Sequence, residues 1–265
     1  MTTTSLPKAP NVWRRRMRTG VIILVLAVIY GWSFTDLSLN TKGFAQGWLI
    51  TKNIFKGLFS PEWSYSGEVL MRLFESIEMA WLGTFIAAIL AIPFGFWAAS
   101  HKGHTYSIGP LSGKWVLSAI RTFPEIILAV VFIVAVGPGA FAGILALGVH
   151  SIGMLGKLYS EAIENIDPGP IEALEAVGAN KLQILWYAIL PQVLPEFASF
   201  AIYRFEINVR AATVLGIVGA GGIGTPLIFA LQGYAWSRVG IIMLGIIVAV
   251  MIIDGLSGYI RSRLV

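Results

Sequence analysis

The sequence contains no cysteine, only three histidines and few charged residues, which make up 12% of its 265 positions. The absence of cysteine excludes disulfide bonds, thiolate nucleophiles and cysteine-based metal sites. His101 and His104 stand close together, but no further ligand accompanies them, so we expect a polar loop there rather than a metal site. Neither disulfide nor metal chemistry is therefore expected of this chain.

Hydrophobic residues are what the sequence has in excess: they make up 56% of it, and the mean hydropathy is +0.77. This composition is far from that of a soluble domain and predicts a polytopic membrane protein. The net charge of +5 does not indicate nucleic-acid binding, because the basic residues stand at the ends of apolar runs and form no patch with interleaved aromatics. Membrane lipid is the expected environment.

The N-terminal region begins like a signal peptide, because Arg14 to Arg16 and Arg18 precede the apolar run from Val21 to Tyr30. No small-residue cleavage pattern follows this run, and several more apolar segments come after it. We interpret it as an uncleaved first membrane span.

Six apolar stretches qualify, or nearly qualify, as membrane spans, which need roughly 20 mainly apolar residues. Only the second and third are long enough to span by themselves. The fifth is long and charged, so we expect it to be broken or largely buried in protein. The pattern predicts an all-α fold with about six transmembrane helices. In chain order the stretches are about Gly20 to Phe34, Met79 to Ala99, Trp115 to Val136, Ala140 to Leu155, Ile184 to Ile217, and Val239 to Ile253.

The distribution of lysine and arginine predicts that both termini are cytoplasmic, because cytoplasmic loops are rich in these residues. With the N-terminus inside, only Lys42, Lys52 and Lys56 fall on the outer side. The basic residues placed inside are Lys8, the arginine cluster, Lys102, Lys114, Lys157, Lys181, Arg261 and Arg263.

Local signals refine this plan. Glu68, Arg72 and Glu75 share one helical face, so a helix is expected to begin outside the membrane and run into the second span. Pro93 is placed to kink that span, and Gly137 to Gly139 forms a tight external turn. We divide the chain into residues 1–66, with the first transmembrane helix and an external loop, and residues 67–265, the core transmembrane domain.

A polar segment between the fourth and fifth stretches, at about residues 161–182, is the most informative part of the sequence. Asp167 precedes two prolines, which is a good helix start, and Glu172 and Glu175 lie where the helix dipole favours acidic side chains. Gly178 ends or bends this helix, which is too short to span a membrane. An amphipathic helix on the membrane surface would need a basic polar face, whereas this one is acidic.

Glu172, Ala173, Gly178, Leu190 and Pro191 resemble the EAA loop of binding-protein-dependent ABC importer permeases. Leu174 and Ala188 depart from the usual pattern without removing the helix and its glycine. The resemblance implies a type I importer fold and a short helix that docks on a separate ATPase subunit. The residues expected to couple to that ATPase are Glu172, Ala173, Glu175, Ala176, Gly178 and Ala179.

A glycine-rich segment fits G-x-G-x-x-G through Gly219, Gly221 and Gly224, with Gly222 beside them. Its context excludes a dinucleotide site, because no strand precedes it and no acidic residue follows at the required distance. Two interpretations remain open: close helix packing at the centre of a dimer, or an unwound stretch whose free N–H groups face a passing anion.

The stretch from Tyr203 to Gly224, YRFEINVRAATVLGIVGAGGIG, together with the EAA loop, resembles the phosphonate-import permease family, which includes phosphite importers. The resemblance implies a homodimer in the bacterial inner membrane, two cytoplasmic ABC ATPases that bind ATP and Mg, and an external or periplasmic binding protein. The chain itself has no G-x-x-x-x-G-K-[ST] motif, so we expect it to bind no cofactor and not to be an enzyme. Methionine-type permeases, secondary transporters and channels are the alternatives.

Charged groups at membrane depth are functional candidates because burying them there is costly. Arg121 with Glu125, and Glu206 with Arg210, are spaced to pair on a single helix. Arg204 and Asn208 lie on nearly the opposite side of the fifth stretch from Glu206 and Arg210, since two residues rotate a helix by about 200°. We expect Arg204 and Arg210 to line the pathway of an oxyanion, and His150 to be a core histidine.

Overall fold

The computed structural model describes residues 12–36, 41–100 and 108–264, and within these ranges the regular structure is helical without any strand. The predicted all-α fold is therefore confirmed for the described part of the chain. The pair His101 and His104 lies outside the described residues. Contacts divide the chain into two units, Met1–Asn53 and Ile54–Val265. Helix α2 crosses this division, and the predicted functional boundary at residue 66 stays a prediction.

The N-terminal unit begins with α1 (Val12–Asp36), which contains the predicted first span. Its most apolar window runs from Arg16 to Ser33 and has no buried residue in this chain. Helix α2 (Thr41–Leu58) occupies the segment that we expected to be an external loop. The segment is therefore helical, and its place outside the membrane stays a prediction.

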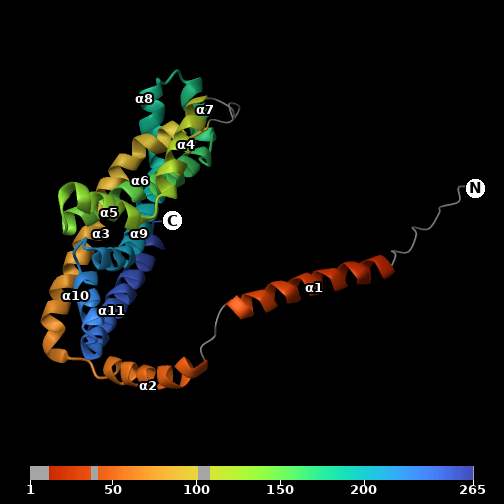
Figure 1. Ribbon diagram of the computed structural model, residues 1–265. Helices are drawn as coiled ribbons and strands as arrows, with labels where there is room; N and C mark the ends of the chain where they lie inside the picture. Colours follow the sequence, from red (N-terminus) through yellow and green to blue (C-terminus); the bar gives the residue numbers. More distant parts are fainter. Residues whose placement is uncertain (1–11, 37–40, 101–107, 265) are drawn as a thin grey trace, which may run out of the picture. The chain divides into compact units, whose positions relative to one another are not determined.

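The second unit is built around two long helices, α3 (Ser66–Ala98) and α6 (Ala140–Glu164) (Figure 1). Small residues bring the two helices together: a Cβ atom on Gly83 would lie 3.1 Å from Leu147 Cβ, and one on Gly95 would lie 2.7 Å from Tyr159 Cβ. Close backbone approach of this kind replaces the hydrophobic effect as the source of helix association in lipid. The pair forms the core of the unit and is contacted by the helices α4 (Ile108–Thr122), α5 (Glu125–Val136), α9 (Leu190–Leu215) and α11 (Trp236–Arg261).

The start of α3 is as predicted, following a 3₁₀ turn at Trp63–Tyr65. Arg72 donates to Glu75 at 2.9 Å and lies 3.6 Å from Glu68, so the three charges share one face of the first turns. Pro93 lies inside α3, and the helix continues past it to Ala98.

The third predicted span is broken in the structure. It consists of α4 (Ile108–Thr122) and α5 (Glu125–Val136), which are bent by 80° at the break. Pro124 causes the break, because it has no N–H to donate and its ψ of 142° is extended rather than helical. The prediction of one continuous third helix is wrong, and so is the predicted pairing of Arg121 with Glu125 on one helix.

The fifth predicted span is irregular, as its charge led us to expect. It begins with α8 (Lys181–Ile184), passes through a π-helical turn at Leu185–Ile189, and continues as α9 (Leu190–Leu215) and a 3₁₀ turn at Gly216–Val218. Three polar residues of α9, Arg204, Glu206 and Asn208, are buried in the bundle. Protein contacts rather than lipid therefore surround the polar part of this span.

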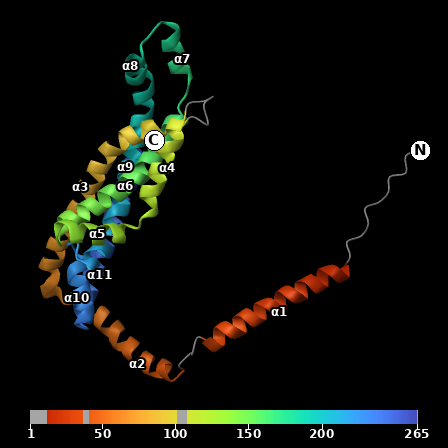
Figure 2. The same cartoon turned by 45° about the horizontal axis from the view of Figure 1, so that its top comes forward.

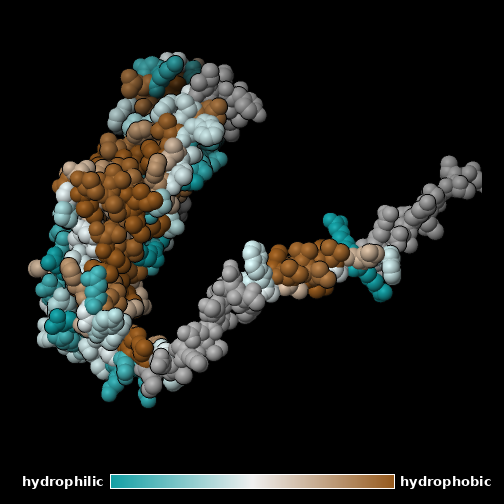
Figure 3. Space-filling view, in the orientation of Figure 1, coloured by the Kyte–Doolittle hydropathy of each residue, from teal (hydrophilic) through white to brown (hydrophobic). Residues whose placement is uncertain are grey.

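The remaining helices are α7 (Gly169–Ala176), α10 (Gly224–Gln232) and α11 (Trp236–Arg261). Two views place α7 and α8 at one end of the second unit and α10 toward the other (Figures 1 and 2). Hydrophobic residues cover most of the middle of this unit in Figure 3. By length and composition, the described helices include five candidate spans, or six if the bent pair counts as one. This confirms the multi-pass organisation; the side on which the termini lie stays a prediction.

Candidate functional site

The exposed helix α7 carries most of the residues expected to couple to an ATPase. Glu172, Ala173, Glu175 and Ala176 are all exposed. Gly178 adopts a φ of +82°, a conformation that glycine reaches without a steric penalty. Its N–H bonds to Glu175 O and the N–H of Ala179 bonds to Leu174 O, each at 3.0 Å, which is the Schellman pattern of helix termination. The predicted helix-ending role of Gly178 is confirmed.

The base of α7 is tied to α9 by one amide side chain. Gln192, in the first turn of α9, accepts a hydrogen bond from the N–H of Asp167 at 2.9 Å and donates to the carbonyl of Asp167 at 3.4 Å. The same amide donates to Ala188 O at 2.8 Å. Asp167 in turn accepts from the N–H of Gly169 at the start of α7. The helix is therefore fixed to α9 at its base.

The far side of the loop is also rigid and presents apolar side chains. Asn180 and Gln183 form a capping box, in which the Asn180 side chain accepts from Gln183 N at 2.9 Å and the Gln183 side chain accepts from Asn180 N at 2.8 Å. Apolar groups gathered on a rigid exposed element are typical of a surface that binds another protein. The large apolar side chains exposed around this loop are Val177, Leu182, Trp186 and Tyr187.

The first polar cluster at membrane depth surrounds Arg204, which is 2% exposed. Its guanidinium group donates to Ser151 Oγ at 2.8 Å and lies 2.7 Å from His150 Nδ1 and 3.5 Å from Glu125 Oε1. Arginine can only donate, so Nδ1 of His150 must carry the lone pair in this contact. The cluster joins α9 to α6 and to the first residue of α5, and His150 is a core histidine as predicted.

Asn208 extends this cluster one turn further along α9. Its Nδ2 atom donates to Thr84 Oγ1 at 2.7 Å and to Ser151 Oγ at 2.9 Å, and the residue is fully buried. The hydroxyl of Ser151 thus receives hydrogen bonds from both Asn208 and Arg204. We call Arg204, Asn208, Glu125, His150, Ser151 and Thr84 the sealed cluster.

A second polar group lies on the opposite side of α9, toward α11. Arg210 donates to Glu206 Oε1 at 2.6 Å, which confirms the predicted pair on one helix. Glu206 also accepts from Arg261 at 3.0 Å, and Arg210 lies 3.5 Å from Asp254. We call these four residues the α9–α11 network. The sequence analysis assigned no site role to Asp254 and Arg261, although Asp254 directly follows the sixth apolar stretch and is a charge at its edge.

The arginines are where the two groups differ in exposure, since the side chain of Arg204 is 3% exposed, although that of Glu125 in the sealed cluster is 29% exposed. The side chain of Arg210 is 47% exposed and that of Asp254 is 40% exposed, whereas that of Glu206 is 10% exposed. Among the described residues, Asp254 Oδ1 and Arg261 Nε are buried atoms without a hydrogen-bond partner. Arg121 is exposed as well, and the bend after α4 separates it from α5.

The glycine-rich segment is both unwound and closely packed within the chain, while its packing in a dimer and its contact with an anion stay predictions. Gly219, Gly221 and Gly222 have φ values between +72° and +98°, so the backbone is unwound there. Close packing is also present, because a Cβ atom on Gly224 would lie 2.8 Å from Gly216 Cα. The segment is anchored within the chain: the N–H of Ile223 bonds to Ser76 Oγ at 2.9 Å.

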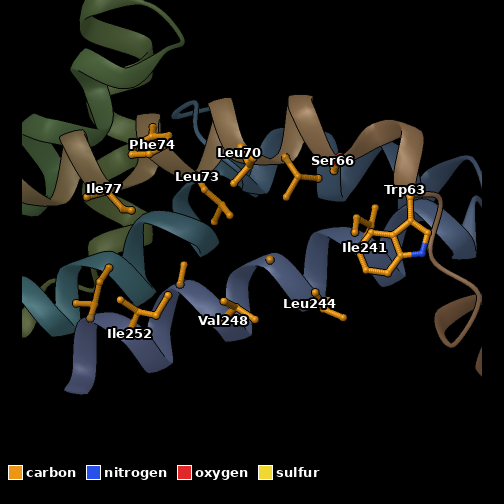
Figure 4. A pocket seen from close by; sticks show the side chains of 14 residues that line it. Trp63, Ser66, Leu70, Leu73, Phe74, Ile77, Ile241, Leu244, Val248 and Ile252 are labelled. Carbon is orange, nitrogen blue, oxygen red and sulfur yellow. The ribbon is translucent and has the colours of Figure 1, made fainter. Parts of the chain in front are cut away.

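An apolar groove of about 390 Å³ lies between α3 and α11 (Figure 4). The labelled side chains that face it include Leu73, Phe74, Leu244 and Val248, and none of its lining residues is ionisable. The groove suits hydrocarbon and offers nothing that would hold an anion. The polar groups of α9 are therefore better suited than this groove to contact an anion.

Comparison with known proteins connects these features. Residues 91–265 match the family model described as "binding-protein-dependent transport system inner membrane component". The chain is 43% identical to the phosphite transport system permease protein PtxC of Stutzerimonas stutzeri, over 95% of this chain and 90% of that protein. It is 39% identical to the phosphate-import permease protein PhnE of Mycolicibacterium smegmatis, over 88% of this chain but 44% of that protein.

Solved structures agree on the fold. An inward-facing structure of the MetNI methionine ABC transporter matches with a TM-score of 0.62 and 24% identity, over 74% of this chain and 96% of that chain. An amino acid ABC transporter matches with a TM-score of 0.63 and 18% identity, over 76% of this chain. At these identities the likeness concerns the fold.

Proposed function

Since this chain belongs to the family of binding-protein-dependent transport system inner membrane components, we propose that it carries a phosphorus oxyanion, such as phosphite or a phosphonate, through the inner membrane. The observation that carries the substrate class is the 43% identity to a phosphite permease along 95% of the chain. Phosphate- and phosphonate-transport permeases among the other relatives support the same class.

The motor of this importer is a separate chain. The exposed helix α7, with Glu172, Ala173 and Ala176 on its surface, docks on a cytoplasmic ABC ATPase that binds ATP and Mg. Small side chains permit close approach, and the exposed Val177 and Leu182 add apolar contact area. Closure of the ATPase sites moves α7, and the Gln192 link passes the movement to α9.

The transporter contains two copies of this chain, two ATPases and an external binding protein that delivers the solute. Closed two-fold symmetry gives each copy of α7 an equivalent ATPase site. The bundle alternates between inward-open and outward-open states, and the oxyanion crosses during this exchange. Weak contacts favour passage over retention in such a cycle.

Arg210 is the cationic group placed to meet the oxyanion. Its guanidinium group is about half-exposed in the bundle, while Arg204 is buried and bonded to the sealed cluster. An exposed guanidinium offers paired N–H donors whose geometry fits phosphorus oxyanions. In this conformation Arg204 holds α9 in place behind Arg210 rather than meeting the solute.

The decisive experiment is ATP hydrolysis by the purified complex in lipid, with the binding protein loaded with phosphite, a phosphonate, phosphate or methionine. Stimulation by phosphorus oxyanions and not by methionine supports the proposal. Stimulation by methionine alone would overturn the substrate class and leave the importer family intact. A chain that transports without any associated ATPase would instead act as a secondary transporter or channel.

A further inference from the structure

The α9–α11 network holds two arginines and two carboxylates at the point where α11 ends, and we infer that its carboxylates release the transported anion. In this inference, which rests on the proposed function, Glu206 and Asp254 compete with the phosphorus oxyanion for Arg210 and Arg261. The competition keeps the anion from being retained in the inward-facing state. Asp254 and Arg261 thereby become part of the transport site.

Both arginines of the network share Glu206 as a partner. Glu206 uses one oxygen for Arg210, at 2.6 Å, and the other for Arg261, at 3.0 Å. Arg210 also lies 3.5 Å from Asp254. Each guanidinium group therefore lies beside a carboxylate of the network.

The charges of the network's own residues balance. Two guanidinium groups and two carboxylates sum to zero, so an arriving oxyanion finds no net positive charge. It binds only by displacing a carboxylate from a guanidinium group. The displaced carboxylate then remains beside the anion and repels it, which lowers the affinity without removing the donors.

The network is open enough for this exchange. The side chains of Arg210 and Asp254 are 47% and 40% exposed, and that of Arg261 is 33% exposed. Within the described residues, the buried atoms Asp254 Oδ1 and Arg261 Nε have no hydrogen-bond partner. The internal hydrogen bonding of the network is therefore incomplete, although Arg72 Nε and Asn208 Oδ1 elsewhere in the bundle also lack a hydrogen-bond partner.

Rearrangement of the network follows from its place between two helices. Glu206 and Arg210 are on α9, whereas Asp254 and Arg261 are on α11. Movement of α9 relative to α11 changes the distances between the carboxylates of one helix and the arginines of the other. The outward-facing state can thus separate Arg210 from Asp254 and leave only Glu206 to be displaced by the anion, and the inward-facing state returns Asp254 to Arg210.

The test measures how tightly the nucleotide-free complex in lipid nanodiscs retains phosphite, with methylphosphonate as a second probe. Asp254→Asn keeps the side-chain shape and removes one competing charge, so phosphite should bind about tenfold more tightly than in the unmodified complex. Phosphite added on the ATPase side should inhibit ATP hydrolysis at a correspondingly lower concentration. Glu206→Gln should act in the same direction.

Two further variants make the result specific. Adding Arg210→Gln to Asp254→Asn should abolish the gained affinity, because it removes the guanidinium group that the missing carboxylate set free. Glu62→Gln removes a carboxylate from a comparable pair, Glu62 with Arg238 at the start of α11, and should leave phosphite affinity unchanged. A merely structural role for the network predicts loss of assembly in these variants, with no gain in anion affinity.

The outcomes separate the two proposals. If Asp254→Asn and Glu206→Gln complexes assemble and respond normally to loaded binding protein, yet hold phosphite no more tightly, the inference is wrong and the proposed function stands. If no phosphorus oxyanion stimulates the unmodified complex, the substrate class fails and the inference fails with it.

Discussion

The polar groups on the two sides of α9 differ in burial and in the helices that they contact. On one side, Arg204 and Asn208 are buried and bonded to α3, α5 and α6. On the other, Glu206 and Arg210 face α11 in a network that is partly open. A helix in a membrane can thus hold one polar face as structure and keep the other available, which distinguishes groups that fix the bundle from groups that meet a solute.

Arg204→Met should have the largest effect, because it removes the centre of the sealed cluster. The substitution leaves Glu125 without its arginine partner at membrane depth. It also removes the hydrogen bond from Arg204 to Ser151 and the contact with His150, and loss of a hydrogen bond made by a charged group costs about 1.5 to 3 kcal/mol. We expect loss of intact permease from the membrane, measured as the yield of monodisperse complex. A normal yield would show that the sealed cluster is not needed to assemble the permease.

Asn208→Leu should weaken the bundle by a smaller amount. The change removes two hydrogen bonds and leaves the hydroxyl groups of Thr84 and Ser151 with fewer partners, at a cost of about 1 to 3 kcal/mol. The complex should assemble with a lower midpoint of thermal unfolding. Ala198→Leu, on an exposed position of the same helix, is the matched control and should leave the midpoint unchanged.

Arg210→Gln should have the opposite effect from the two substitutions in the sealed cluster. It should leave assembly intact and impair transport. The arginine side chain is half-exposed, so its loss leaves the core intact, and Glu206 retains Arg261 as a partner. Uptake of phosphite should fall by about tenfold or more, as expected for one lost charge-assisted contact. Arg210→Lys should restore part of the uptake. Undiminished uptake in a well-assembled Arg210→Gln complex would contradict the proposed role of this side.

Glu62→Gln should have the smallest effect. Glu62 pairs with Arg238 and belongs to neither polar side of α9, so the substitution serves as a control for both. The hydrogen bond from Arg238 lowers the pKa of Glu62. The pair's stabilisation is therefore present above the ordinary carboxylate pKa and is lost only as the pH falls through the lowered pKa in the folded protein. Transport measured between roughly pH 6 and 8 should be the same with and without the substitution. A change there would mean that the exposed pair has a role in the cycle.

Much of this arrangement could be predicted from local spacing. The interval of two residues between Arg204 and Glu206 fixed their opposite directions, and the interval of four predicted the bond between Glu206 and Arg210. The EAA-like loop likewise contained its own helix start and its terminating Gly178.

Contacts between distant segments could not be predicted in this way. Glu125 meets Arg204, 79 positions away, only because the helix breaks at Pro124. Hydropathy is continuous across that break, and a proline is compatible with either a kink or a full turn. Arg261 and Asp254 were missed for the same reason, since their partners on α9 are set by tertiary packing.

The Gln192 amide also makes the connection between α7 and α9 rigid. A short helix on a slack loop would absorb a push from a neighbouring subunit as local bending. With its base fastened at Asp167 to the first turn of α9, the same push becomes a torque on that whole helix. In the proposed transporter, this one side chain would therefore pass a movement of the ATPase to both polar faces of α9 at the same time.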